Sequence, residues 1–212
     1  MAPAPTAGIR ILALGDSYTI GEGVRADERW PIKLAALLRA RGITVSEPHI
    51  IARTGWTTDE LAAAIEAARP AGPFDLVTLL IGVNNQYRGR ASEEYRAEFP
   101  SLLARAIALA GGRADRVIVL SIPDWSVTPF AAECDRAAVA HEIDLFNAIN
   151  QQEAMTRSAG YVNVTPSSRT AAERPDLIAS DGLHPSGDMY TEWASLVLPV
   201  ALAALDRGAP PS

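Results

Sequence analysis

Apolar positions along the chain gather into five short runs, separated by longer segments in which apolar residues recur at helical spacing. Each run is rich in Ile, Leu and Val, which is typical of strands covered on both faces. We predict strands over Ile9–Leu14, Thr44–Ile51, Leu76–Ile81, Val117–Ile122 and Tyr161–Val164.

The segments between these runs carry helix start and stop signals. Pro31 stands in the first turn of one helix and Gly42 ends it, while Thr57 and Glu60 form a capping box for another. We expect five helices, over residues 30–41, 58–68, 92–110, 131–158 and 186–206. Strands alternating with helices predict parallel βαβ units, and therefore a three-layer α/β/α fold. Without repeats or linkers, the chain is expected to form a single domain over residues 1–212, with loose ends at 1–7 and 208–212.

Composition and charge exclude several classes of protein. The formal net charge is -6 and the basic residues are scattered as single arginines, so we expect no nucleic-acid partner. No apolar stretch reaches the roughly 18 residues of a membrane span, and the first residues do not resemble a signal peptide. These features predict a cytoplasmic protein without stable membrane insertion, and they leave its oligomeric state open. Cys134 is the single cysteine and is interpreted as a small apolar residue.

Polar and glycine-rich segments follow the predicted strands. They are Gly15-Asp16-Ser17-Tyr18, Arg53-Thr54-Gly55-Trp56, Gly82-Val83-Asn84-Asn85 and Ser180-Asp181-Gly182-Leu183-His184-Pro185. In an open parallel sheet, ligands bind beyond the carboxyl ends of the strands, where such loops converge. We therefore expect these four segments to meet in one site.

Ser17 is the candidate nucleophile of that site. A serine hydroxyl needs a base within hydrogen-bond reach, and the base needs a partner that fixes its tautomer. Asp181 and His184 are three residues apart, so the carboxylate can accept from one ring nitrogen while the other faces Ser17. Oxyanion donors would come from the Asn84 amide and from the backbone N–H groups of Gly55 and Ser17.

Other acids and histidines are weaker candidates for these roles. Asp16 and Asp59 are alternative acids, but only Asp181 has a spacing to His184 that the sequence fixes. His49 lies in a predicted strand and His141 in a predicted helix, so neither is placed to meet Ser17.

Taken in order, the four segments resemble the motif blocks of the SGNH, or GDSL-type, serine hydrolase family over nearly the whole chain. The resemblance implies a flavodoxin-like sandwich with a five-stranded parallel sheet in the order 2-1-3-4-5, and neither a cofactor nor a metal. It also implies Ser17 as nucleophile, His184 as base and Asp181 as its acid, with Ser17, Gly55 and Asn84 forming the oxyanion hole. Two positions depart from the family pattern: Tyr18 replaces Leu, and Asn85 stands where many members have Asp.

The segment from Ile122 to Phe130 has an unusual aromatic and proline content and follows the fourth strand. One hypothesis is that this segment forms a wall of the acyl or leaving-group pocket, with Trp125 as a candidate substrate-binding residue. The alternative is that Trp125 and Phe130 only pack the loop onto the domain. Further candidates for the pocket are Val83, Trp56 and Tyr87.

The resemblance implies a serine esterase that hydrolyses small-molecule carboxylic esters, with short to medium acyl chains favoured. A carbohydrate O-deacetylase, a lysophospholipase or a thioesterase would use the same residues, and a transacylase is not excluded. From another class, a flavodoxin-like domain could hold a nucleotide or flavin without chemistry. For the esterase, activity should rise with pH as His184 loses its proton.

Overall fold

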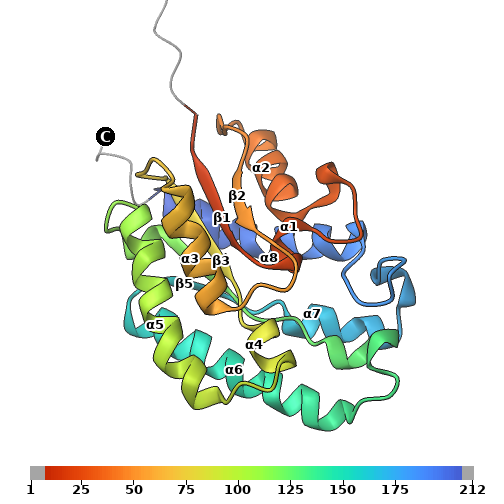
Figure 1. The fold of residues 1–212 in the computed structure, drawn as a ribbon. Helices are drawn as coiled ribbons and strands as arrows, with labels where there is room; N and C mark the ends of the chain where they lie inside the picture. Colours follow the sequence, from red (N-terminus) through yellow and green to blue (C-terminus); the bar gives the residue numbers. More distant parts are fainter. Residues whose placement is uncertain (1–7, 207–212) are drawn as a thin grey trace, which may run out of the picture.

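A five-stranded parallel sheet forms the centre of the fold in the computed structural model, which describes residues 8–206 (Figure 1). The strand order is β2-β1-β3-β4-β5, as predicted for an α/β flavodoxin-like fold. The strands are β1 (Ile11–Gly15), β2 (His49–Ala52), β3 (Leu76–Leu80), β4 (Val117–Leu120) and β5 (Gly160–Val162). The ends expected to be loose, 1–7 and 208–212, lie outside the described residues.

The three central strands are buried along their whole length, because helices cover both faces of the sheet. Only the edge strands β2 and β5 include partly exposed residues. In the ladder, Gly15 at the end of β1 is level with Ala52 of β2 and Leu80 of β3. The loops that follow these three strands therefore start side by side.

Eight α-helices flank the sheet in the described part of the chain. They are α1 (Ser17–Ile20), α2 (Trp30–Ala40), α3 (Thr58–Ala68), α4 (Val83–Tyr87), α5 (Ser92–Leu109), α6 (Arg136–Thr156), α7 (Thr165–Arg169) and α8 (Gly187–Asp206). Helices α2 and α8 pack together on one face, and α3, α5 and α6 cover the other (Figure 1). Short 3₁₀ turns occur at Ala26–Glu28, Ala114–Arg116, Trp125–Val127, Pro129–Ala131, Thr170–Ala172 and Pro175–Leu177.

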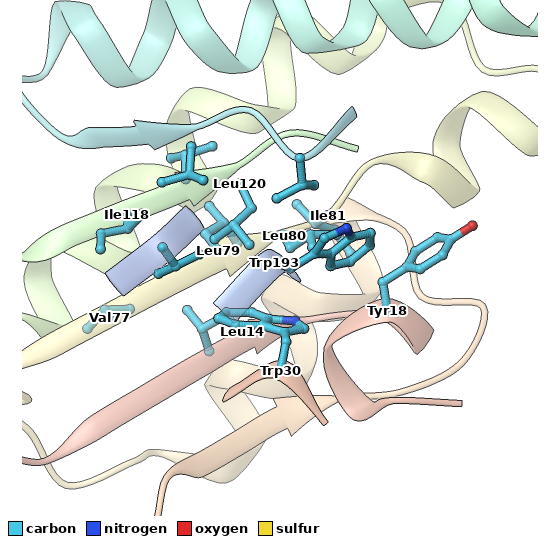
Figure 2. Close-up of a cluster of buried hydrophobic side chains, with 14 of the residues drawn as sticks. Leu14, Tyr18, Trp30, Val77, Leu79, Leu80, Ile81, Ile118, Leu120 and Trp193 are labelled. Carbon is cyan, nitrogen blue, oxygen red and sulfur yellow. The ribbon is translucent and has the colours of Figure 1, made fainter. Parts of the chain in front are cut away.

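A cluster of buried apolar side chains joins the strands to the layer of α2 and α8. Trp30 of α2 and Trp193 of α8 are both fully buried in it, and Tyr18 lies at its edge with its hydroxyl directed away (Figure 2). Truncating a buried tryptophan to alanine typically costs about 3–5 kcal/mol. The first and last thirds of the chain thus share one part of the core.

Several predicted boundaries were wrong. Strand β2 begins at His49, and within the expected strand from Thr44 only Val45 makes an isolated bridge, to Ile9. Helix α6 begins at Arg136 instead of near 131, because the Asp135 side chain accepts the Ala138 N–H and caps the helix there. The short helices α1, α4 and α7 were not predicted.

Cys134 is exposed, contrary to its interpretation as a small apolar residue, because it lies in the loop between the Pro129–Ala131 turn and α6. Within residues 8–206, no helix combines the length and the apolar character that crossing a bilayer requires.

Candidate active site

Ser17 is the first residue of α1 and follows β1 after a single residue, Asp16. The Asp16 side chain caps α1 by accepting the Tyr18 N–H at 3.0 Å. Gly15 permits this sharp turn, because a Cβ there would collide with the Thr19 side chain and with a carbonyl of β3. Amides in the first turn of a helix have no intrahelical acceptor, so the Ser17 N–H can serve an oxyanion.

Asp16 itself is completely buried, and its second oxygen, Oδ2, has no hydrogen-bond partner among the described residues. Desolvation by burial raises its pKa to about 7, although the Tyr18 amide opposes the shift. Its hydrogen bonds are local to α1. It therefore shapes the turn that carries Ser17, and it does not pair with a histidine.

Asp181 and His184 lie in the loop before α8 and are joined by a hydrogen bond of 2.7 Å between Asp181 Oδ2 and His184 Nδ1. The other carboxylate oxygen accepts the backbone N–H groups of Leu183 and His184, both at 2.9 Å. Partial burial raises the pKa of Asp181, but these amides and the imidazole outweigh burial and hold the pKa below its usual value. An ionised Asp181 favours the tautomer that carries its proton on Nδ1, which leaves Nε2 as the acceptor.

The His184 ring and Ser17 border the same cavity, although no hydrogen bond joins Ser17 Oγ to the ring in the described residues. Catalytic contacts of this kind commonly tighten when substrate binds. The Tyr18 ring packs against the imidazole, with ring centroids 5.4 Å apart, and so restricts its orientation.

Gly55 lies in a tight turn after β2. The Trp56 N–H donates to the Arg53 carbonyl at 3.3 Å, and Gly55 takes the third position of the turn with a φ of +85°. A positive φ at this position favours glycine. Among the described residues, the Gly55 N–H donates no hydrogen bond, so it is available to a ligand in the cavity.

Asn84 is the second residue of α4, which begins directly after Gly82. Its Nδ2 donates to the Trp56 carbonyl at 2.9 Å. An amide nitrogen carries two donor hydrogens, so one N–H remains for a ligand. The neighbouring Asn85 is buried and faces α3, where its Oδ1 accepts the Thr58 N–H at 3.1 Å.

The cavity has a volume of about 140 Å³. Its lining consists of Ser17, Tyr18, Thr54, Gly55, Val83, Asn84, Tyr87, Trp125, Phe130, Leu183 and His184. Most of the surface of this lining is apolar. The arrangement provides a hydroxyl, an imidazole backed by a carboxylate, and several N–H donors around one small space.

Three aromatic rings form one side of the cavity. Trp125 lies 5.5 Å from Tyr87 and 5.9 Å from Phe130 between ring centroids, and its indole N–H donates to Gln86 Oε1. Trp125 is buried, whereas Tyr87 and Phe130 are 55% and 47% exposed. The Phe130 N–H donates to the Gly182 carbonyl at 3.0 Å, which joins this wall to the loop carrying Asp181 and His184.

The sequence profile of the GDSL-like lipase/acylhydrolase family matches residues 13–191, a span that contains every part of this site. The chain belongs to this family. This GDSL-like hydrolase is therefore an enzyme that hydrolyses carboxylic esters. A GDSL lipase of Mycobacterium tuberculosis is 27% identical to it over 202 residues, which cover 90% of this chain and 80% of the relative.

Solved structures share the fold of this GDSL-like hydrolase. The acetylxylan esterase Axe2 of Geobacillus stearothermophilus aligns with a TM-score of 0.68 and 20% identity, over 92% of this chain and 94% of the other. A lipase/acylhydrolase of Enterococcus faecalis gives 0.69 and 18%, over 96% and 99%. The structure of TesA gives 0.72 and 20%, over 92% and 99%.

The fold brings most of the predicted site residues together in this hydrolase. The residues that border the cavity are Ser17, Gly55, Val83, Asn84, Tyr87, Trp125 and His184. Asp181 contacts His184 from outside the cavity. Trp56 was predicted to touch substrate, but its side chain packs against the core and only its carbonyl serves the site.

The remaining candidates lie elsewhere. Asp59 pairs with Arg90 at 2.7 Å, and this arginine together with the Thr57 hydroxyl lowers the pKa of Asp59 to about 2. His49 packs edge-on against Phe74, and His141 is exposed on α6.

Thr54, Tyr18 and Leu183 also border the cavity but were not predicted as site residues. Each directly neighbours a motif residue, and that adjacency was the available signal. Phe130, which the sequence assigned either to a pocket wall or to loop packing, borders the cavity as well.

Proposed function

We propose that this GDSL-like hydrolase is a serine esterase for carboxylic esters with short to medium acyl chains, acting through an acyl-enzyme. Ser17 is the nucleophile, His184 the general base, and Asp181 the acid that orients and stabilises the imidazole. The observation that carries the proposal is the 2.7 Å hydrogen bond that Asp181 accepts from a histidine whose ring borders the same cavity as Ser17.

In the first half of the reaction, Ser17 Oγ attacks the ester carbonyl while His184 Nε2 takes the hydroxyl proton. The tetrahedral oxyanion is held by the N–H groups of Ser17 and Gly55 and by the free amide N–H of Asn84. Each such donor contributes roughly 3 kcal/mol to lowering the barrier. As the intermediate collapses, the imidazolium returns the proton to the departing alkoxide oxygen, and an alcohol leaves.

In the second half, His184 takes a proton from water, whose oxygen attacks the acyl carbon on Ser17. The same donors hold the second oxyanion. When the bond to Ser17 Oγ breaks, His184 returns the proton to that oxygen, so a carboxylic acid is released and the free enzyme is regenerated.

The dimensions of the cavity support a short acyl group. Its volume of about 140 Å³ is smaller than the roughly 300–1,000 Å³ of pockets that enclose drug-sized ligands. The half-exposed rings of Tyr87 and Phe130 continue the apolar surface to the rim, where the middle of a longer chain could lie. We therefore expect activity to decrease gradually as the acyl chain of the ester becomes longer.

Hydrolysis of p-nitrophenyl esters from acetate to palmitate tests the proposal. We expect the wild type to turn over the short esters, and Ser17→Ala and His184→Ala to lose nearly all activity. His141→Ala is the matched control, because it removes an exposed imidazole that does not border the cavity. Activity that persists in Ser17→Ala would refute the assignment of the nucleophile.

Trp125→Ala tests the substrate wall separately. Removing this buried ring enlarges the cavity, so we expect the preference to move toward longer esters. An unchanged ranking of chain lengths would limit Trp125 to packing the loop.

A carbohydrate O-deacetylase is the second candidate, because two exposed aromatic rings at a pocket rim offer flat apolar faces that suit a sugar ring as well as an acyl chain. Axe2, which shares the fold, is an acetylxylan esterase. Comparing kcat/KM on acetylated xylooligosaccharides with kcat/KM on p-nitrophenyl acetate separates the two. A sugar acetate that is hydrolysed 100-fold more efficiently would favour the deacetylase.

A further inference from the structure

We propose that Arg88 is a positioning residue that holds the Gly55 oxyanion donor in place from outside the cavity. Its Nη2 donates to the Gly55 carbonyl oxygen at 2.6 Å. Arg88 does not border the cavity, so it acts on the reaction only through Gly55. The inference rests on the proposed function, because it assigns Gly55 the role of an oxyanion donor.

Gly55 needs an external support. Glycine has little intrinsic preference between positive and negative φ, and the one hydrogen bond that closes its turn, from the Trp56 N–H to the Arg53 carbonyl, is long at 3.3 Å. A small rotation of the peptide groups flanking Gly55 would turn its N–H away from the cavity. The guanidinium of Arg88 fixes the carbonyl on one side of this residue, and a charged donor makes a hydrogen bond of this kind stronger.

Helix α4 and the residue that directly follows it, Arg88, support the turn at two consecutive carbonyls. Arg88 binds the carbonyl of Gly55, and Asn84 Nδ2 binds the carbonyl of Trp56 at 2.9 Å. Asn84 is also the third proposed oxyanion donor. The same short segment, residues 83–88, therefore supplies one donor and fixes the position of another, which sets the separation between the two.

Arg88 makes two contacts besides the one with Gly55. Its backbone N–H donates to the Asn84 carbonyl at the end of α4, and its guanidinium lies 3.3 Å from a carboxylate oxygen of Glu60. Glu60 in turn accepts the Thr57 N–H at 2.9 Å in the capping box of α3. The Arg88 side chain is 44% exposed, and exposed ion pairs contribute little to stability by themselves. The contact with Gly55 is the one with a consequence for catalysis.

The test compares Arg88→Ala, Arg88→Lys and Glu60→Gln with wild type on p-nitrophenyl acetate. Removing an oxyanion donor outright typically lowers kcat about 100- to 1,000-fold. Because Arg88→Ala leaves the donor present but poorly held, we expect kcat to fall roughly 10- to 100-fold. KM and the shape of the pH profile should stay unchanged, and Arg88→Lys should recover part of the loss through a single N–H donor.

Two controls isolate the contact. Glu60→Gln removes the ion pair but keeps an acceptor for the capping box, so it should leave kcat within about twofold of wild type. Arg90→Ala removes a neighbouring arginine that pairs with Asp59 instead of the turn, and it should also leave kcat unchanged. Thermal melts of every variant show that the fold is retained. If Arg88→Ala does not fold, Arg88→Lys and Arg88→Gln carry the comparison.

Three outcomes would overturn the inference: kcat within about twofold of wild type in Arg88→Ala, a raised KM at unchanged kcat, or an equal loss of kcat in Glu60→Gln. None of these affects the proposed function, which depends on the loss of activity in Ser17→Ala. If Ser17→Ala retains wild-type activity, the proposed function and the role of Arg88 fail together.

Discussion

Replacing Asn85 with Asp tests why this chain carries an amide where many members of the family carry an acid. Asn85 is fully buried and bonds to two groups of Thr58: its Oδ1 accepts the backbone N–H, and its Nδ2 donates to Oγ1 at 2.8 Å. The same Nδ2 lies 3.5 Å from a carboxylate oxygen of Glu98, which also accepts the Thr58 hydroxyl. A second acid at position 85 would face a carboxylate that is already there.

The size of the effect follows from these contacts. The lost hydrogen bond to Thr58 Oγ1 costs about 1 kcal/mol. Two adjacent carboxylates cannot both ionise at low cost, so the new carboxyl keeps its proton to a higher pH in the folded protein than in the unfolded chain. Its folded pKa is raised, so its contribution to stability is present at low pH and is lost as pH rises. We expect Asn85→Asp to lower the free energy of unfolding by about 1 kcal/mol near pH 4.5 and by about 2–4 kcal/mol at pH 8.

Urea denaturation at pH 4.5 and pH 8 measures this difference. Adding Glu98→Gln to Asn85→Asp should restore most of the stability at pH 8, because the new amide faces the new carboxylate. Gln151→Glu, which introduces a charge at an exposed position of α6, is the control and should change little. The reasoning fails if Asn85→Asp is as stable as wild type at pH 8, or if its loss of stability is the same at both pH values.

Three other changes have definite expected outcomes. Gly15→Ala should lower the free energy of unfolding by at least about 2–3 kcal/mol, because a Cβ there meets the Thr19 side chain and a carbonyl of β3. An unchanged melting temperature would contradict that close approach. Asp16→Asn keeps the helix cap but removes a group whose pKa is raised to about 7, so the stability of the variant should no longer decline between pH 4 and 7. At pH 8 the free energy of unfolding of the variant should exceed that of wild type by up to about 4 kcal/mol. Equal pH dependence of stability in both proteins would refute this. Asp181→Asn should lower kcat by roughly 10³–10⁴-fold, because an amide no longer favours the His184 tautomer with its proton on Nδ1; an unchanged kcat would refute the role of Asp181.

The central strands could be predicted from sequence because both faces are covered, so an apolar run marks their ends to within two residues. The edge strand β2 could not, since its apolar run is interrupted by polar residues and by Pro48. Proline lacks the N–H that a ladder needs, and regular pairing begins at the next residue, His49. Pattern alone does not show where an edge strand meets its neighbour.

The positions of the main site residues could also be predicted, because each follows a strand whose end is fixed by the sheet. The short helices α1 and α4 could not, since four or five residues show no helical period and such helices depend on their surroundings. The aromatic wall depends on a hydrogen bond between Phe130 and Gly182, which are distant in sequence. Contacts of this kind are set by how loops meet, and no local pattern encodes them.

The site joins residues near the two ends of the described chain, and this has a consequence for biosynthesis. Ser17 follows the first strand, whereas His184 precedes α8, whose Trp193 covers part of the core built by β1 and α2. During translation, Ser17 emerges from the ribosome long before His184 does. With the proposed roles of Ser17 and His184, we expect catalysis to begin only after nearly the whole chain has emerged, and a truncated product to remain inert toward the esters around it. The same arrangement would let two separately expressed halves report their own reassembly by regaining hydrolysis.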